Sequence, residues 1–310
     1  SNMGVEYNPH NCTLCPRECH ADRASGMRGL CGCDDGIYVS RAALHQWEEP
    51  CISGTGGSGT IFFSGCPLGC IYCQNREIAL NMHGRKIGVD RLAEICLELM
   101  ERGAHNINLV TPSHYVPHIA CALTKARDMG LTIPVVYNCG GYEKVESLKM
   151  LDGLVDVYLP DMKYMSSERA LRYSKAPDYP ETAMKALAEM FRQTGTPVFD
   201  GDIMVHGMIV RHLVLPAGKQ DSKDVIRYLY DTYGDDIYMS IMSQYTPMPD
   251  FTDGGRLRPD YPELGRRVRR KDYDEVVDYA IDLGVTNAFI QEGDVAKDSF
   301  IPDFDSYEGV

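Results

Sequence analysis

The stretch from residue 64 to residue 75 reads SGCPLGCIYCQN and directly follows the apolar run at 60–63. It places Cys66, Cys70 and Cys73 in a C-x3-C-x2-C pattern. Three thiolates this close can hold three corners of a [4Fe–4S] cube, whereas an electron-transfer cube has four protein ligands. An open coordination position distinguishes a reactive metal site from a closed one. A zinc site or a set of buried thiols fits this spacing less well.

The composition is that of a globular protein with a large core. The chain has 310 residues, 44% of them hydrophobic and 24% charged, and a net charge of -13 that argues against a nucleic-acid-binding surface. No apolar run approaches the ~20 residues of a membrane span, and no signal peptide is visible. We therefore expect a cytoplasmic protein without a membrane partner. Its twelve cysteines are then expected to be metal ligands or free thiols. Cys96 and Cys121 stand singly in helical patterns and are expected to be buried.

From residue 59 onward, apolar strands alternate with amphipathic helices. This alternation predicts an α/β fold with a parallel sheet covered by helices, in a whole or partial barrel. Strands are expected at 60–63, 106–110, 134–137, 155–159, 208–215, 237–242 and 287–291, and helices at 89–102, 116–129, 143–151, 180–194, 221–233 and 271–283. We divide the chain into a cysteine-rich N-terminal segment at 1–55, a barrel at 56–293 and an acidic tail at 294–310.

In such a barrel the chemistry gathers at the C-terminal ends of the strands. The second strand is followed by Thr111, Ser113 and His114. The first two can bind a ligand amine or cap the next helix, and the histidine is either structural or a proton donor. Asn138 follows the third strand, either as a ligand contact or as part of a turn.

Charged side chains follow the fourth strand and interrupt the fifth. Asp161 and Lys163 can contact a cofactor, or form a surface ion pair worth less than ~1 kcal/mol. Arg211 lies inside a strongly apolar strand, where an unpaired charge is costly. We therefore expect an anionic partner for it, and its planar fork suits a carboxylate.

The N-terminal segment carries a second cysteine pattern. Cys12, Cys15, Cys19 and Cys31 have metal-ligand spacing, with Cys33 close behind. Zinc would make a closed structural knot, whereas a second iron–sulfur cluster would relay electrons. The spacing leaves both open and slightly favours a structural metal. The segment HQWEEPC at 45–51, which includes His45 and Trp47, is either a packed linker or a lid or wall of a substrate site.

Six segments in order along the chain read CPLGCIYCQN, LVTPSHYVP, VVYNCGGYE, DVYLPDMKY, VRHLVLPAG and MSQYTP. Together they resemble the radical SAM superfamily, and within it the proteins similar to the pyruvate formate-lyase activating enzyme. The segments CTLCPREC and HQWEEPCISG resemble a subgroup with an extra cysteine-rich N-terminal segment. The resemblance covers nearly the whole chain and implies a partial (β/α)6 barrel.

This resemblance implies a [4Fe–4S] cluster on Cys66, Cys70 and Cys73, with S-adenosylmethionine (SAM) at the open iron. The usual Gly-Gly-Glu after the second strand is replaced by LVT at 109–111, so the SAM amine must be held differently. An Asn also stands at 138, where the activating enzymes carry Asp, which weakens the case for a bound cation. Cofactor contacts are expected at Tyr72 (stacking on adenine), Thr111, Ser113, Asn138, Asp161, Lys163 and Arg211.

The implied activity is reductive cleavage of SAM and hydrogen-atom abstraction. The expected substrate is a glycine Cα–H in a partner glycyl radical enzyme, and the electron comes from a donor such as flavodoxin or ferredoxin. Two alternatives stay open at this point. One is radical modification of another peptide or small molecule, and the other is a non-catalytic iron–sulfur or zinc binding module.

Overall fold

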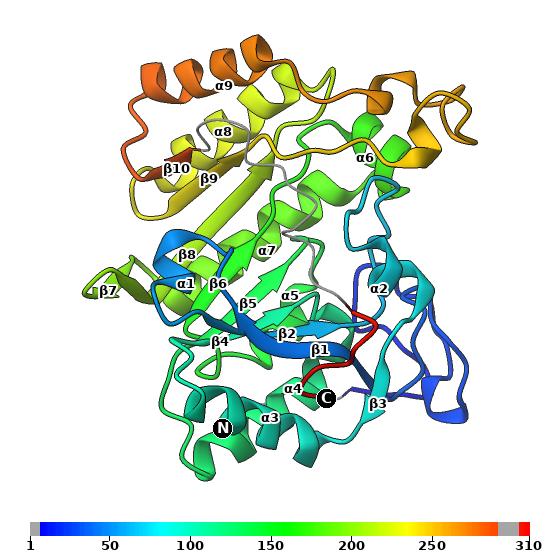
Figure 1. Cartoon of the computed structure of the whole chain (residues 1–310), viewed down its shortest axis with the longest axis vertical. Helices are drawn as coiled ribbons and strands as arrows, with labels where there is room; N and C mark the ends of the chain where they lie inside the picture. Colours follow the sequence, from blue (N-terminus) through cyan, green and yellow to red (C-terminus); the bar gives the residue numbers. More distant parts are fainter. Residues whose placement is uncertain (1–6, 291–303) are drawn as a thin grey trace.

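The computed structural model describes residues 7–290 and 304–310 and contains an open, mostly parallel sheet (Figure 1). The strand order is β10-β9-β8-β6-β5-β4-β2-β1-β3, and β7 pairs with β8 outside this path. The strands are β1 (Ile37–His45), β2 (Ser58–Phe63), β3 (Arg85–Ile87), β4 (Ile107–Val110), β5 (Val135–Cys139), β6 (Val157–Pro160), β7 (Val198–Asp200), β8 (Ile203–Leu213), β9 (Tyr238–Met242) and β10 (Ala288–Ile290). All pairs from β2 to β10 along that path are parallel, so the predicted α/β fold with a partial barrel is confirmed.

Helices connect successive parallel strands. They are α1 (Pro50–Ser53), α2 (Arg76–Asn81), α3 (Val89–Glu101), α4 (Val116–Asp128), α5 (Val145–Lys149), α6 (Ser167–Ser174), α7 (Tyr179–Thr194), α8 (Lys219–Tyr233) and α9 (Arg270–Leu283). Helix α3 packs against α4 at one end of the sheet, and α8 against α9 at the other (Figure 1). Each predicted strand and helix has its counterpart, except that Gln291 lies outside the described residues.

Hydrophobic spacing explains this agreement. Helix α3 buries Leu92, Ile95, Cys96 and Leu99, which recur at three- and four-residue intervals on one face. All six residues of β2 are buried, as expected for a central parallel strand. The prediction for Cys96 is confirmed, but the one for Cys121 is wrong, because that side chain is exposed on α4.

The sequence did not predict β1, which pairs antiparallel with β2. The register shifts between Val39 and Arg41, so the burial pattern loses its strict alternation. A bulge of this kind hides a strand from a period-two search. Through β1, part of the cysteine-rich N-terminal segment joins the main sheet.

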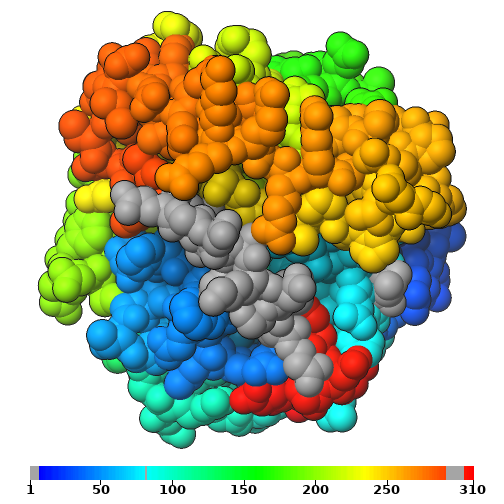
Figure 2. All heavy atoms as spheres, turned by 45° about the horizontal axis from the view of Figure 1, so that its top comes forward, coloured from blue at the N-terminus to red at the C-terminus, as the bar shows by residue number. Residues whose placement is uncertain are grey.

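The last described residues, 304–310, also lie against this edge (Figure 2). The ring of Phe304 packs edge-on against Phe62 with centroids 5.3 Å apart. The main-chain N–H of Ala42 donates to the carbonyl of Glu308 at 2.8 Å. The division into three segments stays a prediction, and most of the expected acidic tail, 294–303, lies outside the described residues. Within the described residues, no helix is long and apolar enough to span a bilayer.

Gly141, just after β5, is required by the backbone. It has φ +79°, and a Cβ there would lie 2.1 Å from the carbonyl oxygen of Asp161. Only glycine adopts this conformation at low cost and also allows so close an approach. The turn therefore fixes the position of the chain that carries Asp161.

We expect Gly141→Ala to destabilise the fold by at least ~2 kcal/mol more than Gly153→Ala, because overpacking adds to backbone strain. Gly153 is the matched control: its φ is +80°, and a Cβ added there would have no neighbour within 4 Å. Urea unfolding of both variants measures the difference. An equal decrease in the free energy of unfolding for both variants would show that the close contact between the added Cβ and Asp161 does not destabilise the fold.

Candidate active site

The loop between β2 and α2 carries the three closely spaced cysteines. Cys70 is buried and Cys66 and Cys73 are partly exposed. The hydroxyl of Ser174 donates to Cys70 Sγ at 3.0 Å, and the main-chain N–H of Cys73 donates to the carbonyl of Cys70 at 3.2 Å. The loop thus holds the three thiols together at the C-terminal end of a parallel strand.

Two of these thiols, Cys66 and Cys73, are poor acids without a metal. Burial is the main reason that the pKa of Cys66 is raised to about 11 and that of Cys73 to about 12, and the neighbouring cysteines of the loop act in the same direction. The positive charge of Lys163 acts in the opposite direction on both. Because metal ligands must be deprotonated, loading this loop requires proton release and a compensating cation. The Lys163 ammonium is placed to compensate the thiolates.

A network of charges joins the ends of β6 and β8. Lys163 Nζ donates to Asp161 Oδ2 at 2.7 Å, and Arg211 Nε donates to Asp161 Oδ1 at 3.1 Å. Burial alone would raise the pKa of Asp161, but the charges of Lys163 and Arg211 outweigh it and hold that pKa below its ordinary value. Asp161 is therefore ionised and orients both cations.

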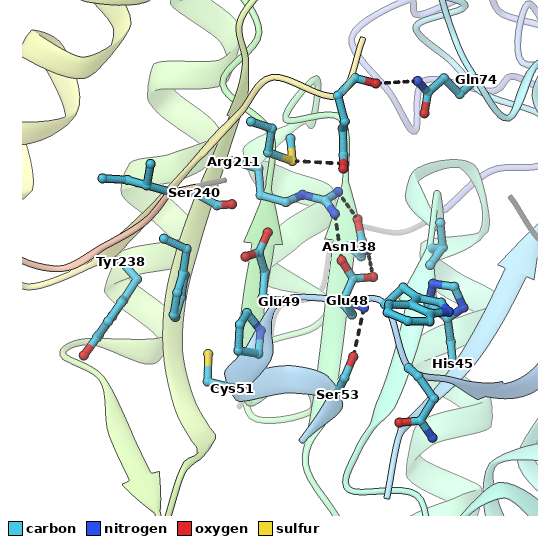
Figure 3. Close-up of a pocket in the computed structure, with 18 of the residues that line it drawn as sticks. His45, Glu48, Glu49, Cys51, Ser53, Gln74, Asn138, Arg211, Tyr238 and Ser240 are labelled. Carbon is cyan, nitrogen blue, oxygen red and sulfur yellow. Dashed lines mark hydrogen bonds and ion pairs between the residues drawn. The ribbon is translucent and has the colours of Figure 1, made fainter. Parts of the chain in front are cut away.

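The rest of the Arg211 fork is occupied as well (Figure 3). One terminal nitrogen donates to Asn138 Oδ1 at 2.6 Å, and the other donates to Glu48 Oε1 at 2.9 Å. Glu48 Oε2 accepts from the amides of Asn108 at 3.0 Å and Asn138 at 3.2 Å. The expected anionic partner of Arg211 is thus a pair of carboxylates, and Glu48 is a site residue that the sequence did not single out.

The segment at 45–51 forms one wall of a cavity of about 1360 Å³ (Figure 3). Glu49 also faces this cavity; burial raises its pKa, while the charge of Arg211 lowers it in part. The opposite wall reaches Gln74 and Asn75, which directly follow Cys73. Further lining residues include His45, Trp47, Asn138, Arg211 and Ser240. Between the two predicted roles of this segment, the geometry favours a wall of the site.

The family model of the radical SAM superfamily matches residues 60–214. The chain belongs to the radical SAM superfamily. Its sequence is 27% identical over 277 residues to the uncharacterized protein MJ0674 of Methanocaldococcus jannaschii, covering 87% of this chain and 74% of that protein.

The fold is similar to that of SuiB from Streptococcus suis, solved with the precursor peptide SuiA bound. The TM-score is 0.51 at 11% identity, and the match covers 73% of this chain. It covers 46% of the SuiB chain, so this chain spans about half of that protein. Radical SAM membership implies a [4Fe–4S] cluster and SAM. The three clustered thiols and the facing Lys163 ammonium fit an anionic iron–sulfur cluster.

Several residues that were predicted to contact SAM in this radical SAM chain make contacts with other parts of the protein. Tyr72 is buried, its hydroxyl accepts from Tyr164 at 2.8 Å, and its ring packs edge-on against Tyr173 and Tyr245. It is not among the residues that line the cavity, and its contact with adenine stays a prediction. Thr111 has φ +58° and donates its main-chain N–H to the carbonyl of Asn138 at 2.9 Å.

Ser113 and His114 are buried behind the strand ends. The Ser113 hydroxyl donates to Glu143, and His114 Nε2 lies 2.8 Å from the carbonyl oxygen of Ser64. Burial lowers the pKa of His114 to about 3, so this ring stays neutral at physiological pH. Both contacts favour structural roles; the proposed contact between Ser113 and the SAM amine stays a prediction.

The N-terminal cysteines lie in one region of the structure, and their role as metal ligands stays a prediction. Residues 12–33, which we call the cysteine head, form the dark blue trace beside α2 in Figure 1. A Cβ on Gly29 would lie 3.1 Å from Cys19 Sγ and 3.5 Å from Cys31 Sγ, so this glycine leaves room between two thiols. Burial is the main reason that the pKa of Cys15 is raised to about 12, and the nearby Cys31, Cys12 and Cys19 act in the same direction.

Glu143 is buried and accepts hydrogen bonds from Ser113 and Tyr137, and it makes the free energy of unfolding depend on pH. Burial raises its pKa to about 7, although hydrogen bonds from Ser113 and Tyr137 lower it in part. The folded state therefore binds a proton that the unfolded state releases, so this contribution is present at low pH and is lost as pH rises through 7. We expect a loss of about 1 kcal/mol from pH 6 to pH 8.

Replacing Glu143 by Gln should remove this component, because the amide keeps the acceptor for Ser113 and Tyr137 but does not titrate. The measurement is the free energy of unfolding at pH 6 and pH 8, for the wild type and Glu143→Gln. An identical pH dependence in both proteins would show that Glu143 titrates normally.

Proposed function

We propose that this chain cleaves SAM reductively and uses the product to remove a hydrogen atom from a peptide segment. The most specific substrate that we propose is a glycine Cα–H of a partner glycyl radical enzyme. The proposal is carried by one observation. The three-cysteine loop and the Lys163–Asp161–Arg211 network converge at the same end of the parallel strands.

When bound, the cluster and SAM would supply the difficult chemistry, which is one-electron cleavage of SAM to methionine and a 5′-deoxyadenosyl group able to take a hydrogen atom. The protein binds and orients. Cys66, Cys70 and Cys73 would hold the cluster, and Lys163 would bind the methionine carboxylate together with the N–H groups of Arg211 that Asp161, Glu48 and Asn138 leave unused. Asp161 fixes both cations. These charged side chains are 17–19% exposed, so little water competes with a bound carboxylate.

Glu49 is our proposed partner for the SAM ammonium, in place of the absent Gly-Gly-Glu. It is an acid of the cavity wall, and the charge of Arg211 affects its pKa. Burial raises the pKa of Glu49 and so favours its neutral form. A cation bound beside Glu49 would favour the ionised form, and the two charges would stabilise each other. Glu48 is less suited, because both of its oxygens are already used by Arg211, Asn108 and Asn138.

A peptide substrate is supported by size. The cavity of about 1360 Å³ exceeds the ~300–1000 Å³ of ordinary small-molecule pockets. The structurally similar SuiB is solved with a precursor peptide, so this fold admits a peptide in at least one protein. A glycine Cα–H suits the reaction because two flanking amides delocalise the resulting radical. We propose flavodoxin or ferredoxin as the electron donor.

Anaerobically reconstituted protein should release 5′-deoxyadenosine from SAM when dithionite is added. Cys70→Ala should lose this activity by at least about 100-fold, because the cluster loses one of three ligands. Cys121→Ala, which changes an exposed thiol, should keep it. Iron binding at the loop without SAM cleavage would favour a binding module instead.

The same assay tests the substrate. A glycyl radical enzyme containing α-deuterated glycine should transfer deuterium into 5′-deoxyadenosine and give an organic-radical electron paramagnetic resonance signal. Deuterium transfer from a labelled small metabolite, without transfer from the protein, would overturn the peptide assignment while leaving SAM cleavage intact.

Glu49→Gln should weaken SAM binding by about 10-fold or more, because a charge-assisted hydrogen bond of ~1.5–3 kcal/mol is lost. Equilibrium binding of SAM to the reconstituted protein measures this change. Glu181→Gln is the control, because that carboxylate is exposed on α7 and pairs only locally with Lys185. Unchanged affinity in Glu49→Gln would exclude Glu49 as the ammonium partner.

A further inference from the structure

We propose that the cysteine head binds a second [4Fe–4S] cluster through Cys12, Cys15, Cys19 and Cys31, and that this cluster exchanges electrons with the cluster of the radical SAM loop. The metal site stands on the geometry of the head alone. The electron exchange rests in addition on the proposed function.

The first support is the way the four thiols are enclosed. Cys12, Cys15 and Cys31 are 5%, 8% and 8% exposed, and Cys19 is partly exposed. The two residues beside Cys19 are Glu18 and His20, with φ +40° and +55°. Non-glycine residues in this region are strained, so the chain bends at a cost around Cys19. Gly29 leaves the space between Cys19 and Cys31 free of a side chain.

The second support is the spacing of the sulfurs, which separates the two metals. Four thiolates on one zinc at about 2.3 Å lie ~3.8 Å from one another. Within residues 7–290 and 304–310, only one group of three His, Cys, Asp or Glu residues has its ligand atoms within 4.8 Å of one another. This group is Glu77, His83 and Asp305, and none of these residues belongs to the head. No three sulfurs of the head are therefore as close as zinc requires. A cube spreads its four thiolates over four irons and needs a wider arrangement.

The third support is the buried cation Arg23. Its side chain is 1% exposed and donates to the carbonyls of Asp34 at 2.9 and 2.7 Å and of His114 at 3.0 Å. Within the described residues no carboxylate lies within ion-pair distance of it, whereas one terminal nitrogen lies 3.8 Å from Cys12 Sγ. A buried guanidinium needs a counter-charge, and four thiolates on a cluster supply one.

The head also contacts the radical SAM loop directly. The main-chain N–H of Cys66 donates to the carbonyl of Cys31 at 3.1 Å, so a single hydrogen bond joins a ligand of each cluster. Arg17 clamps the same loop, donating to the carbonyls of Pro67 at 2.9 Å and Leu68 at 3.0 Å. An electron from a low-potential one-electron donor would reduce the head cluster. That cluster is reoxidised as the loop cluster gains the same electron, with no proton transferred and no bond broken.

The metal site is tested by iron and zinc content after anaerobic reconstitution. The triple variant Cys66→Ala, Cys70→Ala, Cys73→Ala should keep about four irons per chain, and its dithionite-reduced form should show the electron paramagnetic resonance signal of a reduced cluster. The double variant Cys12→Ser, Cys15→Ser should also keep about four irons, and Cys121→Ala should match the wild type at about eight. One zinc in the triple variant, or no metal, would overturn the proposal. This count is independent of SAM cleavage.

Electron exchange is tested by stopped-flow reduction of the loop cluster in the double variant Cys12→Ser, Cys15→Ser. With photoreduced flavodoxin, reduction should be at least about tenfold slower than in the wild type, while SAM binding is unchanged. Equal rates would show that electrons reach the loop without the head. Cys121→Ala reports any general effect of removing a thiol.

Discussion

The neutralisation of Arg211 is the constraint on which the site depends. A guanidinium within an apolar strand is tolerated only where anions surround it, and here Asp161 and Glu48 do so from two different parts of the chain. Glu48 brings the segment before α1 over the ends of β4 and β5. Asp161 in turn holds Lys163, which faces the cysteine loop. One buried charge thus ties together the wall of the cavity, the strand ends and the metal-binding loop.

The positions of the parallel strands could be predicted from the sequence because these strands are continuously apolar and the helices between them are amphipathic. The same regularity predicts that Asn138, Asp161 and Arg211 meet, since all three lie at the same ends of neighbouring strands. It does not reveal β1, whose bulge near Ser40 breaks the alternation. The sequence also does not reveal the three short helices α1, α2 and α6, which have too few turns to show a helical period.

The site was harder to predict where contacts join distant segments. Glu48 and Arg211 are 163 residues apart, and the sequence WEEP contains two equivalent acids. Both acids line the cavity, and nothing in the local sequence shows which of them pairs with the arginine. Ser113 and His114 were expected near the ligand because they follow a strand. Thr111, which precedes both residues, has a left-handed backbone conformation that bends the chain. A threonine gives no sign of this conformation in the sequence, because it rarely adopts it.

The cysteine head holds the radical SAM loop in place through hydrogen bonds. A loop with three metal ligands needs support, and here much of that support comes from the head, through Arg17 and the carbonyl of Cys31. A purely structural knot would explain the clamp by Arg17. The thiolates of such a zinc knot would also neutralise the buried Arg23, but they would not explain why no three sulfurs of the head are as close together as one zinc ion requires. A cluster in the head explains all three, because its negative charge stabilises Arg23 and its size suits the spacing. Its ligand Cys31 then lies one hydrogen bond from the site where an electron is needed.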